Sequence, residues 1–192
     1  MDFSREAERA RSYLDLGPQD IRVIRQIRPL IVSHEDEIIQ GVLNSLLSDQ
    51  EAVSVVKESG LSAERAIALF RSVVRLTLSG DFDGEHAKRV FIVGAAHLRV
   101  GVGHRLMTLN AGAFAREVAR VLGEARMCEA VVSAMKAIFW TLSIITESYL
   151  EAERRSLKEA SGLKPELVER LKRVKAKEIY EEFRTERGTG ST

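Results

Sequence analysis

One histidine of this chain is placed where an imidazole could bind a metal. His97 lies in an apolar stretch, VGAAHLRVG at residues 93–101. Residues three, four and seven positions apart share a face of an α-helix, so Val93, His97, Val100 and Gly101 are expected on one side. An imidazole on that side costs free energy unless it is satisfied. A hydrogen bond to a core carbonyl is the common solution. Ligation of a metal, as by the axial imidazole of a haem, is the sharper alternative.

Other residues that could do chemistry are poorly placed for it. A single cysteine, Cys128, excludes an internal disulfide and a Cys-rich metal site. It lies among Met127, Val131 and Val132, so we expect a small core residue rather than a nucleophile. Gly101-Val102-Gly103 is not a dinucleotide fingerprint, because no strand precedes it. The sequence has no His-Glu-x-x-His motif and no phosphate-binding loop, so an enzyme is not predicted.

The charge balance argues against two classes of partner. The 29 Lys and Arg residues and 28 Asp and Glu residues leave a formal charge of +1 among 192 residues. This balance gives no electrostatic reason to expect binding to nucleic acid or to a membrane surface. The longest apolar stretch, residues 137–145, is too short to span a bilayer. Residues 1–11 are charged and lack an apolar core, so we predict no secretory signal and expect a cytoplasmic location.

The pattern of the remaining residues predicts an all-α fold. Only three prolines occur, and Val, Ile and Thr never alternate cleanly with polar residues. Helices are expected at residues 2–14, 21–31, 35–47 and 50–58, from Ser62 to about 78, from Asp83 to about 100, and at 106–122, 126–162 and 165–183. Residues 188–192 are expected to be disordered.

The helix expected at residues 126–162 is apolar over most of its circumference. A helix of this kind is buried on two sides. We expect one side to pack on the core of its own chain and the other on a second copy. Phe114, Phe139 and Trp140 are expected in the core or in this contact. The last helix has a basic face that we expect to be solvated, formed by Arg170, Lys172, Arg173, Lys175 and Lys177.

Two motifs in a fixed order resemble the globin domain of globin-coupled sensors and protoglobins. The turn LSGDFD at residues 78–83 precedes Gly-x-x-His-x-x-x-Gly, centred on His97, at the spacing of that family. Upstream, LGPQD at residues 16–20 and IRPLI at residues 27–31 resemble the start of the same domain. The resemblance covers about residues 14–150.

This resemblance implies a globin-like helical fold with an extra N-terminal helix and a C-terminal helical extension. It implies haem b, with His97 as the proximal iron ligand, and a diatomic gas (O2, CO or NO) as the ligand sensed. The haem pocket is then expected to include Leu43, Leu46, Leu69, Phe70, Val73, Val93, Val100 and Met107. A homodimer built from the last two globin helices, and signalling through that interface, are implied as well.

In the sensor proteins an output module follows the globin domain. Here we expect a sensor-globin domain at residues 1–160, and a helical extension with a tail at residues 161–192. The residues after Leu150 carry no kinase, cyclase or methyl-accepting signature. The chain is therefore either a stand-alone globin of this type or a sensor domain with its linker, with a downstream signalling module as a possible partner.

The sequence departs from the family pattern on both sides of the expected haem. Where the family has Phe-Tyr over the distal face, this chain has Val42-Leu43, and a shift of one residue would place the Asn44 amide there instead. The other distal positions carry no donor: Ala66, Leu69, Phe70, Val73 and Val74. After the proximal helix, His-Arg-Leu-Met at residues 104–107 replaces Pro-x-Trp-Tyr. A distal side without a donor predicts weak dioxygen binding relative to carbon monoxide.

Three other histidines are weaker candidates. His104 follows the glycine turn and could touch a haem propionate, but we expect an exposed loop residue. His86 and His34 are expected at the surface. Two other functions stay open beside a haem-binding gas sensor. One is a haem-free globin-fold regulatory domain that binds a partner or an apolar ligand such as a fatty acid, and the other is haem-based redox chemistry.

Overall fold

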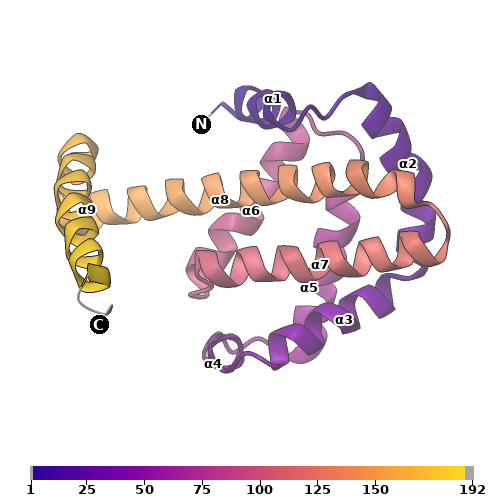
Figure 1. Ribbon diagram of the computed structural model, residues 1–192, viewed down its shortest axis with the longest axis horizontal. Coiled ribbons are helices and arrows are strands. Elements are labelled where there is room, and N and C mark those ends of the chain that lie inside the picture. The colour runs from indigo at the N-terminus through magenta and orange to yellow at the C-terminus, as the bar shows by residue number, and fades with distance from the viewer. Residues whose placement is uncertain (1, 189–192) are drawn as a thin grey trace. The chain divides into compact units, whose positions relative to one another are not determined.

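The prediction of an all-α fold is confirmed. The computed structural model describes residues 2–188, and within them every regular element is helical (Figure 1). The first helices are α1 (Phe3–Tyr13), α2 (Pro18–Ser33), α3 (Glu35–Leu47), α4 (Gln50–Glu58) and α5 (Ala63–Thr77). They are followed by α6 (Gly84–Arg99), α7 (His104–Glu124), the short 3-10 helix η1 (Cys128–Ala130), α8 (Val131–Ser161) and α9 (Pro165–Gly188). The expected tail at residues 189–192 lies outside the described residues.

Local signals set most of the helix starts. The side chains of Asp2, Ser62 and Asp83 each accept a hydrogen bond from a backbone N–H in the first turn of α1, α5 and α6. Pro18 begins α2, where its missing N–H has no helical partner to lose. Gly101 ends α6 with a φ of +77°, a left-handed conformation that glycine adopts without strain.

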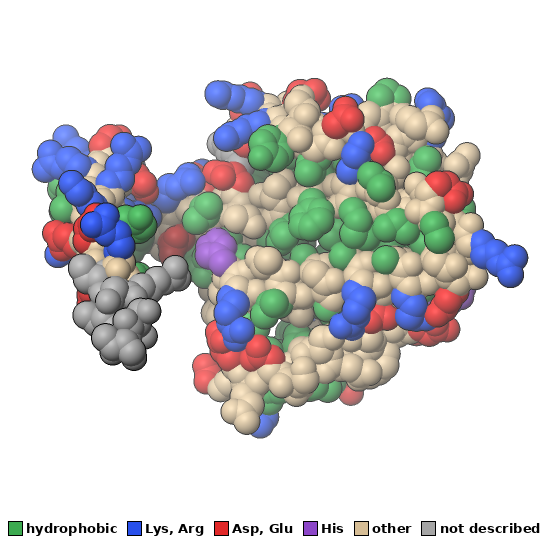
Figure 2. Space-filling model, in the orientation of Figure 1, with side chains coloured by type: hydrophobic (Ala, Val, Ile, Leu, Met, Phe, Trp, Pro, Cys, Tyr) green, Lys and Arg blue, Asp and Glu red, His purple; other side chains and the backbone are tan. Residues whose placement is uncertain are grey.

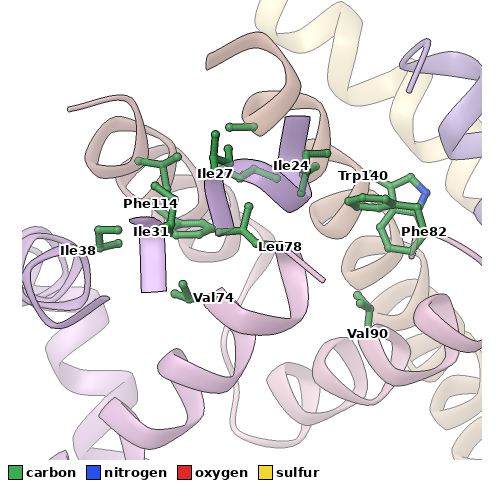
Figure 3. Close-up of a cluster of buried hydrophobic side chains, with 14 of the residues drawn as sticks. Ile24, Ile27, Ile31, Ile38, Val74, Leu78, Phe82, Val90, Phe114 and Trp140 are labelled. Carbon is green, nitrogen blue, oxygen red and sulfur yellow. The ribbon is translucent and has the colours of Figure 1, made fainter. Parts of the chain in front are cut away.

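The chain divides into two compact units, Met1–Tyr149 and Leu150–Thr192. The first unit holds one hydrophobic core, to which α2, α3, α5, α7 and α8 all contribute (Figure 3). Within it α3 packs along α7, and α6 packs along α1. The domain boundary expected at residue 160 falls near the end of α8.

The second unit contains the end of α8 and all of α9. Leu157, Leu163 and Val168 line a small hollow between these segments. The basic side chains of α9 from Arg170 to Lys177 are exposed, as expected for a solvated face. Lys172 and Lys175 form ion pairs with glutamates on the same helix.

A corner between α5 and α6 is closed by His86, and here the sequence prediction was wrong. His86 is fully buried rather than at the surface. Its Nδ1 accepts a hydrogen bond from the Phe82 backbone N–H at 2.9 Å, and its ring lies 4.7 Å from that of Trp140. His86 lies one turn after the cap Asp83, where the first turn of α6 meets the core at Trp140, and its side chain folds back over the preceding loop. This contact helps hold Phe82 at a φ of +49°, which is rare outside glycine.

Trp140 anchors the same region of the core. It is fully buried, and its Nε1 donates a hydrogen bond to the Ala7 carbonyl at 3.1 Å. The Phe82 ring meets it edge-on at 5.1 Å, and Figure 3 shows the two rings against each other. Phe114 is also in the core, as expected, whereas Phe139 is half-exposed.

Cys128 corrects a second expectation. It is exposed rather than buried. In the short helix η1 the buried position is taken by Ala130, so the apolar neighbours of Cys128 in sequence do not enclose it. By length and composition, the helical segment Cys128–Ser161 could cross a membrane, but half of its most apolar part is buried inside the protein, as in the core helix of a globular domain.

Candidate functional site

His97 lies in the last two turns of α6 with one ring nitrogen engaged. Its Nδ1 is 2.7 Å from the carbonyl oxygen of Val93, one turn earlier in the helix. A carbonyl only accepts hydrogen bonds, so Nδ1 carries the proton and donates it. In the neutral ring Nε2 then has a free lone pair. Within the described part of the chain, Nε2 has no hydrogen-bond partner.

The surroundings of His97 favour the neutral ring. Burial lowers the pKa of His97 below its ordinary value, and the hydrogen bond to Val93 opposes this only in part. At neutral pH the imidazole is therefore uncharged, which is the form that binds metals. The two roles weighed for His97 are compatible, since a metal-bound histidine commonly donates its other N–H to a backbone carbonyl.

The eight other predicted pocket residues come from α3, α5, α7 and the region of α6. Met107 is part of the core. Leu43, Phe70 and Val93 are half-buried and pack against that core. Leu46, Val73 and Val100 are half-buried, and Leu69 is 52% exposed. Met107 thus lies in the core and Leu43, Phe70 and Val93 lie against that core, whereas Leu69 faces largely to solvent.

On α3, the helix expected over the distal face, apolar side chains turn toward the core and the Asn44 amide turns outward. Val42 is fully buried and Leu43 is half-buried. Asn44 is exposed, and its Oδ1 accepts a hydrogen bond from Gln40 Nε2 at 2.9 Å on the outer face of the helix. The amide that a shift of one residue would have placed at the site therefore lies outside it.

Ion pairs hold α3 in place on both sides. Glu35 at its start accepts hydrogen bonds from Arg75 of α5 at 2.6 and 2.9 Å. Glu117 of α7 is buried beneath Gly41 and is paired with Arg116 and Arg120. Burial alone would raise the pKa of Glu117, but these two arginines outweigh it and lower the pKa. Both glutamates are thus held ionised. Arg120 also pairs with Glu37 of α3 at 3.5 Å, so ion pairs of Glu35 and Glu37 fasten α3 to α5 and α7.

The loop after His97 leads directly into α7. His104 begins α7 and is exposed, as predicted. Its partner was not predictable from the sequence: the His104 ring meets the ring of Tyr149 in α8 edge-on, at 4.3 Å. Next to it, Arg105 forms ion pairs with Asp49 and Glu51 and links α7 to α4. His34 is half-buried, with Nδ1 at 3.0 Å from the Leu30 carbonyl.

Other kinds of site find no support. Among residues 2–188 no three His, Cys, Asp or Glu side chains are grouped as metal ligands. A metal held through His97 would therefore have this one protein ligand, as in a haem rather than in a cage of protein ligands. The hollow lined by Leu157 and Val168 in the second unit has room for little more than a water molecule.

Known proteins share the fold of this chain and, over most of its length, its sequence pattern. The chain is similar in fold to the globin domain of a globin-coupled sensor from Geobacter sulfurreducens, with a TM-score of 0.66 and 16% identity over 74% of this chain and 96% of that one. No curated protein matches the chain. The model of the family described as Protoglobin matches residues 4–155, most of the chain. The protein has a globin-like fold and belongs to the protoglobin family.

Proposed function

We propose that the protein is a haem b-binding sensor globin that binds a diatomic gas at an iron held by His97. The observation that carries the proposal is the state of the His97 ring. Val93 fixes the proton on Nδ1, and Nε2 is left with a lone pair and no partner within the described residues. In a chain of the protoglobin family, this nitrogen would hold the iron of a bound haem.

The residues present fit a haem. Leu43, Phe70 and Val93 are half-buried apolar side chains against the core, and they have surface that a flat apolar ring would cover. Bound haem would supply an iron with one open position for a gas. The protein's own part is to orient the His97 ring, to keep Nε2 unprotonated and to exclude water with the apolar side chains of α3 and α5.

The ligand class follows from the distal side. Bound dioxygen carries partial negative charge, which a hydrogen-bond donor stabilises, whereas carbon monoxide depends far less on a donor. Leu43 offers none, and Asn44 is turned outward. We therefore propose that the protein releases dioxygen quickly and holds carbon monoxide or nitric oxide better. We also propose that it signals rather than catalyses and that it works in the cytoplasm.

A homodimer through α7 and α8 completes the proposal. Val132 and Phe139 of α8 are 63% and 51% exposed, and the half-buried Met135 and Leu142 continue the same stripe at intervals of three and four residues. This spacing is that of a helix–helix seam. Leu109 of α7 is exposed as well. Figure 2 shows apolar side chains gathered over α7 and α8 on this face.

The first test is the visible absorption spectrum of the purified protein with added hemin, before and after dithionite and carbon monoxide. We expect stoichiometric uptake and a sharp Soret band that shifts on reduction and again on gas binding. The band should be lost or altered in His97→Ala and retained in His34→Ala, a histidine outside the site. Absence of uptake, or identical spectra for wild type and His97→Ala, would refute the proposal and favour a haem-free regulatory domain.

Turnover separates the sensor from a redox enzyme. With a reductant and either nitric oxide or peroxide, we expect stable ligand binding and no sustained consumption. Multiple turnovers would instead support haem-based redox chemistry.

A further inference from the structure

The helix that carries His97 approaches α8 without a side chain between them. A Cβ added at Gly94 would overlap the Ile145 carbonyl oxygen and lie 2.6 Å from Ser148 Cβ. Only glycine fits at this point, because the contact is with backbone that cannot move aside. Gly94 lies one turn before His97 and next to Val93, whose carbonyl orients the His97 imidazole.

A buried hydrogen bond joins the same two helices. Ser148 of α8 is fully buried, and its Oγ donates to the carbonyl oxygen of Phe91 in α6. This side chain is therefore a positioning residue, since it holds the backbone of α6 and is not itself one of the predicted pocket residues.

A second contact reaches the same part of α8 from the segment that follows the C-terminal end of α6. The Val102 N–H donates to the His97 carbonyl at 3.0 Å, which fixes the turn into α7. His104, the first residue of α7, then packs against Tyr149. Residues 91–97 of α6 are thus flanked by two contacts, and both fall on residues 145–149 of α8.

We propose that residues 145–149 of α8, fastened to α6 through Gly94 and Ser148, couple the iron ligand to the rest of α8. This inference rests on the proposed function. Close-packed backbones transmit a displacement rather than absorb it. A shift of His97 on gas binding must therefore either carry this turn of α8 along or break the Ser148 hydrogen bond. Tyr149 ends the first unit, and α8 itself continues to Ser161.

Ser148→Ala is the variant that tests the coupling. It removes the hydrogen bond while leaving a side chain that fits, so the fold and the haem ligand are kept. Ser143→Ala is the matched control: Ser143 is exposed on the same helix, and its hydroxyl donates to the Trp140 carbonyl at 2.7 Å, within α8. Gly94→Ala is a second variant, which forces α6 away from α8 and should shift the iron–histidine vibration.

The measurement is hydrogen exchange, followed by mass spectrometry, of peptides covering residues 145–161 in the ferrous and the carbon monoxide-bound holoprotein. We expect gas binding to change the exchange in wild type and in Ser143→Ala, and that change to be lost in Ser148→Ala. Two results obtained with haem bound would refute the coupling. One is equal hydrogen exchange in the ferrous and the carbon monoxide-bound wild type, and the other is a wild-type change in exchange in Ser148→Ala. Failure to take up haem would refute the proposed function, and the coupling with it.

Discussion

At the scale of single residues, one hydrogen bond decides what His97 offers to a ligand. Donation from Nδ1 to Val93 leaves Nε2 as the only lone pair of the ring. Two successive residues of α3 decide whether the expected distal side has a hydrogen-bond donor, since Leu43 points inward and Asn44 points outward. Changing either residue therefore tests a distinct part of the proposed chemistry.

A donor introduced at Leu43 should slow the loss of dioxygen. Leu43→Tyr restores the residue type the family has there, and we expect the dioxygen dissociation rate to fall about tenfold or more, because a hydrogen bond to a charged acceptor contributes about 1.5–3 kcal/mol. Carbon monoxide dissociation should change little. Stopped-flow measurements on the reduced protein give both rates.

Asn44→Ala is the control for the distal register. Because Asn44 pairs with Gln40 on the outer face, its removal should leave dioxygen dissociation unchanged. Faster loss of dioxygen in Asn44→Ala would show that the amide already serves as the distal donor.

His86 should make the stability of the apoprotein pH-dependent. Burial, reinforced by the charge of Arg89, lowers the pKa of His86 from 6.5 to about 4. Between these values the unfolded chain takes up a proton that the folded chain does not, so the free energy of unfolding falls as the pH is lowered through this window. The total loss is about 3 kcal/mol, from about 1.4 kcal/mol per unit of pKa shift. His97 contributes with the same sign.

Urea unfolding of wild type and His86→Gln at several pH values measures this effect. The variant cannot titrate, so its stability should fall less steeply between about pH 6.5 and pH 4. Parallel profiles for wild type and His86→Gln would contradict the assignment.

At the scale of elements, the helices could be predicted and the contacts between them could not. Periodicity and caps such as Ser62 and Asp83 are local, so they mark helix ends without knowledge of the fold. Likewise, His97 stands out from its apolar helical neighbours alone. Burial of His86 and exposure of Cys128 depend on which turn meets the core, and sequence neighbours do not reveal that.

The closest helix contacts depend on pairs far apart in the chain. Gly94 and Ser148, or Gly41 and Glu117, come together only once α6 crosses α8 and α3 lies on α7. A glycine inside a helix signals close approach, but not what it approaches. The apolar nature of the site was accessible from sequence, whereas the outward position of Asn44 required the structure.

The α3–α7 contact should be sensitive to one methyl group. A Cβ at Gly41 would lie 2.7 Å from Glu117 Oε1, and Glu117 cannot yield because Arg116 and Arg120 hold it. We expect Gly41→Ala to lower the free energy of unfolding by about 1–3 kcal/mol, as overpacking does. Chemical denaturation gives the value.

Gly123→Ala is the matched change in open space. Nothing lies within 4 Å of a Cβ at Gly123, so the gain in helix propensity should stabilise the protein by about 0.5–1 kcal/mol. Equal effects at the two glycines would show that the Glu117 contact is not what makes Gly41 necessary.

At the scale of the whole molecule, the exposed apolar stripe of α8 should decide the oligomeric state. We expect wild type to be a dimer and Phe139→Glu to be a monomer, because a charge at the centre of the seam would be buried without a partner. Sedimentation velocity distinguishes the two. Ile92→Glu is the control, since Ile92 is 69% exposed and belongs to α6 rather than to α7 or α8. Dissociation by both variants, or by neither, would place the interface elsewhere.

The placement of Trp140 gives the protein a built-in optical probe. It is the only tryptophan of the chain, and it lies in the first unit with Nε1 on the Ala7 carbonyl and its ring against His86. Its fluorescence is therefore expected to respond to three separate events: release of α1, protonation of His86, and energy transfer to a bound haem. The second unit contains no tryptophan, so tryptophan emission comes from the first unit alone.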